Sequence, residues 1–239
     1  MDVNNTYYLM DNVAPGTVIR HYMSKEHLYE LLNTGSFYIK RKKHYKDSHE
    51  CGLPPWRLFD FKIVEGDNPC AASPKCVLLN KEGAKETRDN AYLPTSCWTE
   101  FIGENMLMWQ SRQKSTSDET VCIKTTVHKL ASALINDIYD VICLRIQYVN
   151  RSCLNCTIGN LYTKELAYAG EKEIRFYLVP KDGEIINKSE DHIFIKVIPE
   201  DFIEEVVLSP YFDKDCVDGI FQFVEQKGLL ISKSKIKIQ

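Results

Sequence analysis

The segment 171–179, EKEIRFYLV, alternates polar and apolar side chains at every second position. Successive side chains of a β-strand point to opposite faces, so this pattern predicts a strand that separates an apolar face from a polar one. The apolar face would hold Ile174, Phe176 and Leu178, and the polar face would hold Glu171, Glu173, Arg175 and Tyr177.

Two carboxylates and a guanidinium on one strand face are costly unless they are solvated or used. Glu171 and Glu173 repel each other, which tends to raise the pKa of one of them, while Arg175 can hold one carboxylate ionised. Such a group suits acid/base chemistry or the binding of a sugar hydroxyl. The alternative interpretation is the solvated outer face of an edge strand.

Segments of this kind outnumber the helical ones. Strands are predicted at 17–23, 37–41, 57–64, 96–102, 120–126, 139–149, 192–198 and 204–210, with a last one carrying Lys233, Lys235 and Lys237 on one side. Helices are predicted at 25–33, 104–112, 127–138 and 213–227, the first capped by Ser24 and ended by Gly35. Because strands and helices do not alternate regularly, we expect an α+β fold with mixed or mainly antiparallel sheets and peripheral helices, and the strongly apolar strand 139–149 near the centre.

We expect a single domain over residues 1–239, with an irregular insertion at about 48–95 that is rich in proline and poor in periodicity. A chain of 239 residues with 44% hydrophobic content can bury a large core. Residues 1–15 lack the pattern of a secretion signal, and no apolar run is long enough for a membrane helix. A cytoplasmic location without a membrane partner is therefore expected.

Nine cysteines, an odd number, are interpreted as reduced thiols that pack as small hydrophobic side chains. A zinc site is the alternative interpretation, because a tetrahedral thiolate site needs two pairs of cysteines. Its ligands would be Cys70, Cys76, Cys153 and Cys156.

Several ordered motifs resemble domain of unknown function family 2971, which is associated with bacteria and phages. They are CWTEFIGENMLMW at 97–109, VCI at 121–123, the Y-x-x-E-x-E-x-R segment at 168–175, and EEVVLSP followed by a helix. The resemblance covers most of the chain, and it implies a family without implying an activity. After Trp109 the chain reads Gln-Ser-Arg, where the family more often has serine-histidine-tyrosine.

The order of elements is also similar to that of ADP-ribosyltransferases. The shared features are a first strand with Arg20 and His21, a helix, the L-x-x-G-x-F-Y pattern at 32–38, and a late strand with E-x-E. This resemblance implies an ADP-ribosyltransferase-like fold and an NAD-dependent enzyme, either an ADP-ribosyltransferase or an NAD glycohydrolase, in toxin or phage-defence biology. It leaves the acceptor open between a protein, a nucleic acid and water. It implies Glu173 as the catalytic carboxylate and Glu171 as its partner on the substrate side. The candidates for binding NAD are Arg20, His21, Tyr22, Tyr38, Trp109 and Arg175.

The residue types suit this chemistry. Departure of nicotinamide leaves an oxocarbenium-like ribose, and a fixed carboxylate that binds a ribose hydroxyl stabilises its positive charge. We therefore predict that strands 17–23 and 171–179 lie in one sheet, with Arg20, Tyr22 and both glutamates around a pocket that Trp109 partly walls.

Two other functions stay open. A nucleic-acid-binding protein or metal-dependent nuclease would use the basic run 40–46, the three lysines near the C-terminus, and the two glutamates as a metal site, although the net charge of −3 argues against a broad phosphate-binding surface. A non-catalytic interaction protein would need only a stable fold. The sequence contains no P-loop, GxGxxG, H-E-x-x-H or G-x-S-x-G motif.

Overall fold

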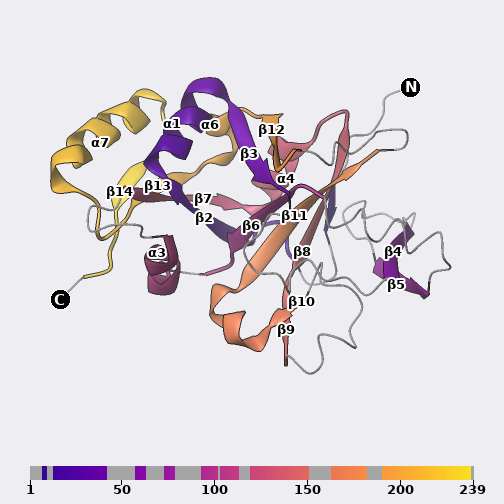
Figure 1. Ribbon diagram of the computed structural model, residues 1–239. Coiled ribbons are helices and arrows are strands. Elements are labelled where there is room, and N and C mark those ends of the chain that lie inside the picture. The colour runs from indigo at the N-terminus through magenta and orange to yellow at the C-terminus, as the bar shows by residue number, and fades with distance from the viewer. Residues whose placement is uncertain are drawn as a thin grey trace.

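A computed structural model describes residues 7–9, 13–41, 57–62, 73–78, 93–101, 103–112, 119–150, 163–181 and 190–237. An eight-stranded sheet runs through the molecule (Figure 1). From edge to edge its strands are β1 (Tyr7–Leu9), β8 (Tyr139–Arg145), β11 (Glu173–Pro180), β6 (Thr95–Thr99), β2 (Val18–Ser24), β7 (Thr120–Thr126), β13 (Glu205–Leu208) and β14 (Ile231–Lys233). Each edge strand is parallel to its neighbour and the other pairs are antiparallel, which confirms the predicted α+β class.

Three two-stranded sheets accompany the main one. They pair β3 (Ser36–Lys40) with β12 (His192–Lys196), β9 (Gln147–Val149) with β10 (Thr163–Glu165), and β4 (Arg57–Lys62) with β5 (Ser73–Leu78). The last pair lies in the predicted insertion, where the sequence indicated β4 but not β5.

One face of the main sheet carries the large hydrophobic core. It is covered by the β3–β12 sheet and by α1 (Lys25–Thr34), α4 (Val127–Leu134), α6 (Pro199–Phe202) and α7 (Val217–Gln226), with η4 (Lys214–Cys216) just before α7 (Figure 1). The predicted caps of α1 are confirmed. The Ser24 side chain accepts a hydrogen bond from the His27 backbone N–H, and Gly35 ends the helix at φ 60°.

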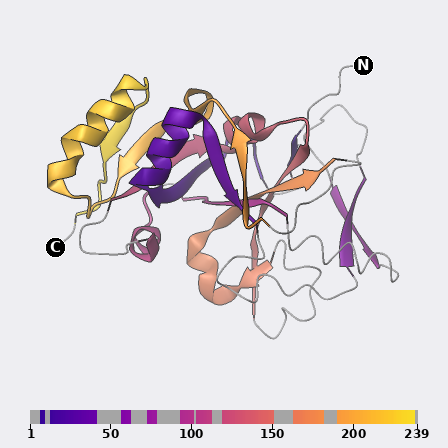
Figure 2. The same ribbon diagram turned by 45° about the horizontal axis from the view of Figure 1, so that its top comes forward.

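The opposite face carries the short elements α3 (Met106–Arg112) and η3 (Leu166–Glu171), as Figures 1 and 2 both show. Trp109 of α3 packs edge-on against Tyr22 of β2, with ring centroids 4.6 Å apart. Trp98 of β6 instead belongs to the large core on the first face. The two tryptophans of the 97–109 motif therefore lie in different clusters, because Trp98 is on a strand and Trp109 on a helix beyond a turn.

Three strand predictions need correction. The segment 139–149 is not one central strand: it breaks at Ile146 into β8 and β9, and β8 lies second from an edge. Strand β11 begins at Glu173 and not at 171, because Lys172 adopts a left-handed conformation (φ 44°) that ends η3 and breaks the extended chain. Strand β14 ends at Lys233, although Lys233, Lys235 and Lys237 are all exposed.

The helices at 104–112, 127–138 and 213–227 are also shorter than predicted, since α3 begins at Met106, α4 ends at Leu134 and α7 begins at Val217. In the part of the chain that is described, no helix is both long enough and apolar enough to cross a membrane.

Candidate functional site

A row of polar residues crosses the centre of the main sheet on the α3 side. Thr99 of β6 is the register partner of both Arg20 of β2 and Glu173 of β11. Residues directly opposite each other on paired strands point to the same face, so the three side chains share one face. With strands about 4.8 Å apart, the Cα atoms of Arg20 and Glu173 lie about 10 Å from each other.

Glu173 is the centre of a buried ion-pair network. Its carboxylate accepts hydrogen bonds from Arg175 Nε at 2.8 Å and Arg175 Nη2 at 2.9 Å. Lys164 Nζ of β10 lies 3.3 Å from Glu173 and 2.8 Å from Glu171, and so joins the two carboxylates. The side chains of Arg175 and Glu173 are only 0% and 7% exposed, whereas that of Glu171 is 25% exposed.

These contacts decide the charge of Glu173. Burial by itself would raise the pKa of this carboxyl, but the charge and hydrogen bonds of Arg175, together with the charge of Lys164, lower it to about 2. The expectation that Arg175 holds one carboxylate ionised is met at Glu173, where two cations outweigh the neighbouring carboxylate. The edge-strand alternative is wrong, since β11 lies between β8 and β6 and its polar face is buried.

The segment between β6 and α3 covers this row together with η3. Arg20 Nη1 donates to the Phe101 carbonyl oxygen, and the Thr99 hydroxyl donates to the Glu171 carbonyl oxygen. Asn105 of this segment links the sheet to η3. Its backbone N–H donates to Tyr22 Oη of β2 at 3.1 Å, and its Nδ2 donates to the Gly170 carbonyl oxygen of η3 at 3.0 Å. The cover is therefore held to the sheet by side chains from β2 and β6.

The structure brings together Arg20, Tyr22, Trp109, Glu171, Glu173 and Arg175 on the α3 side of the sheet. Strands β2 and β11 lie in one sheet, as predicted, with β6 between them. Trp109 is fully buried against Tyr22, and its Nε1 donates to Glu104 Oε2 at 3.1 Å.

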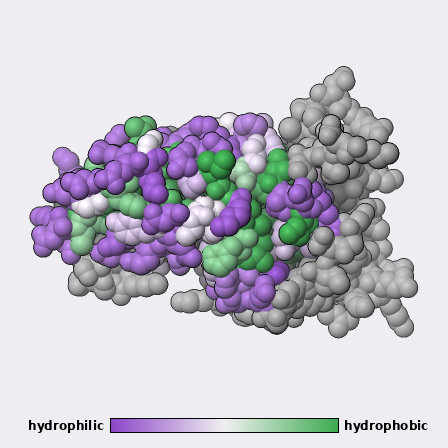
Figure 3. Space-filling model, turned by 90° about the horizontal axis from the view of Figure 1, so that it is seen from above, coloured by the Kyte–Doolittle hydropathy of each residue, from purple (hydrophilic) through white to green (hydrophobic). Residues whose placement is uncertain are grey.

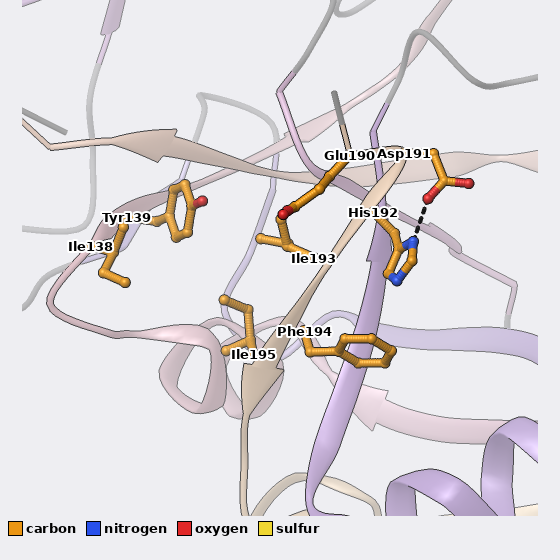
Figure 4. Close-up of a pocket in the computed structure, with 8 residues that line it drawn as sticks. All are labelled: Ile138, Tyr139, Glu190, Asp191, His192, Ile193, Phe194 and Ile195. Atoms are coloured by element: carbon orange, nitrogen blue, oxygen red, sulfur yellow. Dashed lines mark hydrogen bonds and ion pairs between the residues drawn. The ribbon is translucent and has the colours of Figure 1, made fainter. Parts of the chain in front are cut away.

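Two predicted site residues lie elsewhere. His21 points to the large-core face, where its Nδ1 lies 2.8 Å from the Cys97 carbonyl oxygen and its ring packs on Trp98. Tyr38 is on the outer face of the β3–β12 sheet, which covers that same core. A cavity of about 850 Å³ beside β12 is lined by Ile138, Tyr139, Glu190, Asp191, His192, Ile193, Phe194 and Ile195, so it is separate from the Arg20–Glu173 row (Figure 4).

Three residues around Glu173 were not identified from the sequence: Lys164, Tyr148 and Thr99. Lys164 lies on a three-residue strand without periodicity, and Tyr148 lies on the short β9, where its hydroxyl accepts the Glu173 backbone N–H at 2.8 Å. Thr99 could be found from the sequence, because it follows Trp98 on a predicted strand. If Trp98 points into the core, Thr99 and Cys97 point to the opposite face.

The metal site that the nuclease alternative places at Glu171 and Glu173 is not supported by these contacts. Glu171 and Glu173 are bound by Lys164 and Arg175, so their oxygens face cationic side chains and not an open metal position. Among the described residues, no group of three or more His, Cys, Asp and Glu side chains is placed to hold a metal ion. Cys70, Cys153 and Cys156 lie outside the described residues, as do residues 42–46 of the basic run, while Arg41 is buried.

No family model and no curated protein match the chain, so the resemblance to domain of unknown function family 2971 stays a prediction. Solved structures similar to this chain include Thermus sp. 2.9 DarT in complex with NAD+. The two share 9% identity and a TM-score of 0.42, and the match covers 94% of this chain and 98% of that one. Thermus sp. 2.9 DarT in complex with ADP-ribosylated ssDNA has 9% identity, a TM-score of 0.42, and coverage of 93% and 96%. A TM-score of 0.42 is too low to identify a fold family or an activity.

Proposed function

We propose that the chain is an NAD-consuming enzyme of the ADP-ribosyltransferase type, whose site includes the row of Arg20, Thr99 and Glu173 beneath the segment between β6 and α3. The observation that carries this proposal is the register itself: an arginine of an early strand and a glutamate of a late strand flank one polar strand on a single face. This is the arrangement that the similarity to ADP-ribosyltransferases implies for residues that are 153 positions apart.

In the proposed reaction the bond between ribose C1′ and the nicotinamide nitrogen breaks, and its electron pair leaves with nicotinamide. The oxocarbenium-like ribose then bonds to an acceptor nucleophile or to water, which loses a proton. Glu173 is ionised at neutral pH because its pKa is about 2, as the stabilisation of a positive ribose requires.

The carboxylate contacts suggest how Glu173 would reach the ribose. Arg175 holds it through two short hydrogen bonds, whereas the Lys164 contact is longer, at 3.3 Å. A ribose hydroxyl would replace Lys164, and Arg175 would keep the carboxylate oriented. Glu171, which is more exposed, would face the acceptor.

The test is release of nicotinamide from NAD by the full chain and by three variants. Glu173→Gln should lower the rate by roughly 10²–10³-fold, because the charge that stabilises the transition state is lost. Glu171→Gln should mainly reduce transfer to an acceptor and leave hydrolysis by water. Glu205→Gln is the matched control: Glu205 faces the same side, is bound to Lys124 at 3.3 Å, and lies about 19 Å from Glu173 across four strand spacings.

Thermal melts must accompany the assay, with rates measured well below the melting temperature of each variant. Absence of nicotinamide release by wild type, with and without cell extract as a source of acceptors, would refute the proposal. Equal loss in Glu205→Gln and Glu173→Gln would show that the loss reflects a general disturbance of this face.

A further inference from the structure

Strand β12 presents an unpaired edge. Among the described residues it is hydrogen-bonded only to β3. Just beyond its last pair, the Val197 N–H donates to the Gly35 carbonyl oxygen at 2.8 Å. In an antiparallel ladder, residues that bond to the partner strand alternate with residues that do not. The backbone N–H and C=O groups that point away from β3 are therefore those of His192, Phe194 and Lys196.

This edge lacks the protection that strand edges usually have. Proteins cover an open edge or guard it with lysine, proline or a bulge, because unpaired backbone groups attract another strand. The edge strand β14 carries the exposed Lys233 and is followed by the exposed Lys235. Strand β12 instead places Phe194, which is 47% exposed, at its centre, and its lysine, Lys196, is its last residue. Figure 3 looks onto this side of the molecule from above, and hydrophobic residues interrupt its hydrophilic surface.

The cavity of about 850 Å³ beside β12 lies along the same edge. Ile138 and Tyr139 form its far wall, and Ile193 and Ile195 of β12 lie on the side of the strand that faces them (Figure 4). A second hollow of about 340 Å³ follows at the end of β12, where residues of α4 and α6 line it. We call these two hollows the β12 groove. An added strand needs backbone partners along its length and apolar contacts for every second side chain, and the β12 groove supplies both.

The charges of the β12 groove favour a basic occupant. The exposed acids that line it are Glu190, Asp191 and Asp201. Lys196 is the one lysine or arginine among the described lining residues, and its Nζ already donates to the Ser36 hydroxyl at 2.8 Å and to the Thr34 carbonyl oxygen at 3.1 Å. A second copy of this chain, paired edge to edge, would add the same three acids to the groove. Charge complementarity therefore favours a basic segment of another protein.

We propose that the β12 groove binds an extended basic peptide segment of a partner protein by strand addition. The segment runs antiparallel to β12, and its backbone bonds to His192, Phe194 and Lys196. Its alternate side chains are apolar and lie against Ile193 and Ile195, while its basic residues face the acids at the start of β12. The proposal is independent of NAD chemistry, because the candidate catalytic row lies on the other face of the main sheet.

The test is titration of the full chain into the fluorescein-labelled peptide Thr-Val-Thr-Val-Thr-Lys-Lys, followed by anisotropy. In the antiparallel register its third residue lies opposite Phe194, and its last two residues lie opposite Asp191 and Glu190. N-methylation of the third residue removes an N–H that faces β12, so it should weaken binding by at least about 10-fold. N-methylation of the fourth residue removes an N–H that faces away from β12, so this matched peptide should bind like the parent.

A matched pair of protein variants tests the strand edge itself. Phe194→Ala removes the ring and keeps the backbone N–H, whereas Phe194→Pro removes both. Because this N–H does not bond to β3, proline should be tolerated at this edge position. Phe194→Pro should bind the peptide at least about 10-fold more weakly than Phe194→Ala does. Circular dichroism confirms the fold of each variant, and Lys233→Gln, which lies outside the groove, should bind like wild type.

Several results would overturn the proposal. One is the absence of binding by wild type at concentrations up to about 1 mM. Another is equal weakening by the two N-methylations, since backbone pairing would then not explain binding. Equal binding of the acidic peptide Thr-Val-Thr-Val-Thr-Glu-Glu would contradict a basic partner. Dimerisation of the chain that Phe194→Pro abolishes, measured by sedimentation velocity, would assign the edge to a second copy and so also overturn the proposal.

Discussion

At the scale of the residue, the most informative group is Glu173. Its charge is compensated by Arg175, which is completely buried, and by Lys164 from a different sheet. Removing one partner of a buried pair is far costlier than removing a surface charge, because the other charge stays buried and uncompensated. The same carboxylate is thus a candidate catalytic group and a structural one.

Glu173 should make the protein sensitive to acid. Its pKa falls from 4.5 in the unfolded chain to about 2 in the folded one, so it contributes stability above pH 4.5 that is lost as the pH falls through 2. This contribution is about 3 kcal/mol. Urea unfolding at several pH values between 6 and 2 measures it, and Glu173→Gln should flatten this part of the curve.

At neutral pH Glu173→Gln should also lower the free energy of unfolding by about 3–5 kcal/mol, since Arg175 loses its counter-charge. Glu205→Gln, at a partly exposed pair, should cost only about 1 kcal/mol or less. If both variants had the same stability at neutral pH, the ion pair of Glu173 and Arg175 would contribute no more to stability than the partly exposed pair of Glu205 and Lys124.

At the scale of the element, the turn after α1 joins the helix to the β3–β12 sheet. Gly35 ends α1, its N–H donates to the Leu31 carbonyl oxygen at 2.8 Å, and its own carbonyl oxygen accepts the Val197 N–H at 2.8 Å. A Cβ atom at this position would lie 2.7 Å from the Val197 carbonyl oxygen. The turn therefore requires glycine both for its left-handed backbone and for the close approach of another chain segment.

Gly35→Ala should be more destabilising than Gly228→Ala. Both residues have positive φ, 60° and 74°, so each substitution costs about 1–2 kcal/mol of backbone strain. Only Gly35 adds a backbone clash, which raises the expected cost to more than about 2 kcal/mol. Denaturant unfolding of the two variants compares them, and equal costs would show that the Val197 segment shifts freely.

At the scale of the whole molecule, one sheet separates two sets of packed side chains. Trp98 reports on the large core, and Trp109 reports on the smaller cluster with Tyr22 and Cys122. Because both clusters take side chains from the same strands β2, β7 and β13, we expect them to unfold together.

The test uses Trp98→Phe, in which Trp109 is the reporter, and Trp109→Phe, in which Trp98 is the reporter. Both are made in a Trp56→Phe background, because Trp56 is the third tryptophan of the chain. Fluorescence in guanidinium should give transitions that coincide with the loss of far-ultraviolet circular dichroism in each variant. An earlier transition of the Trp109 reporter would contradict a single unit and would show that the α3 side opens first.

Much of the local structure was predictable from the sequence. Alternation placed Ile174, Phe176 and Leu178 on one face of β11 and Arg20 and Tyr22 together on β2, and cap residues gave both ends of α1. These features depend on neighbours a few positions away, because the period of a strand or helix is a property of its own backbone.

Only the tertiary structure decided which residues share the site. The strand order that brings Arg20, Thr99 and Glu173 into register, the approach of Lys164, and the separation of Tyr38 from that row all join distant parts of the chain. Which of these contacts form depends on the apolar surface that the whole molecule buries and on the entropy lost in closing long loops. Neither quantity can be read from a local sequence pattern.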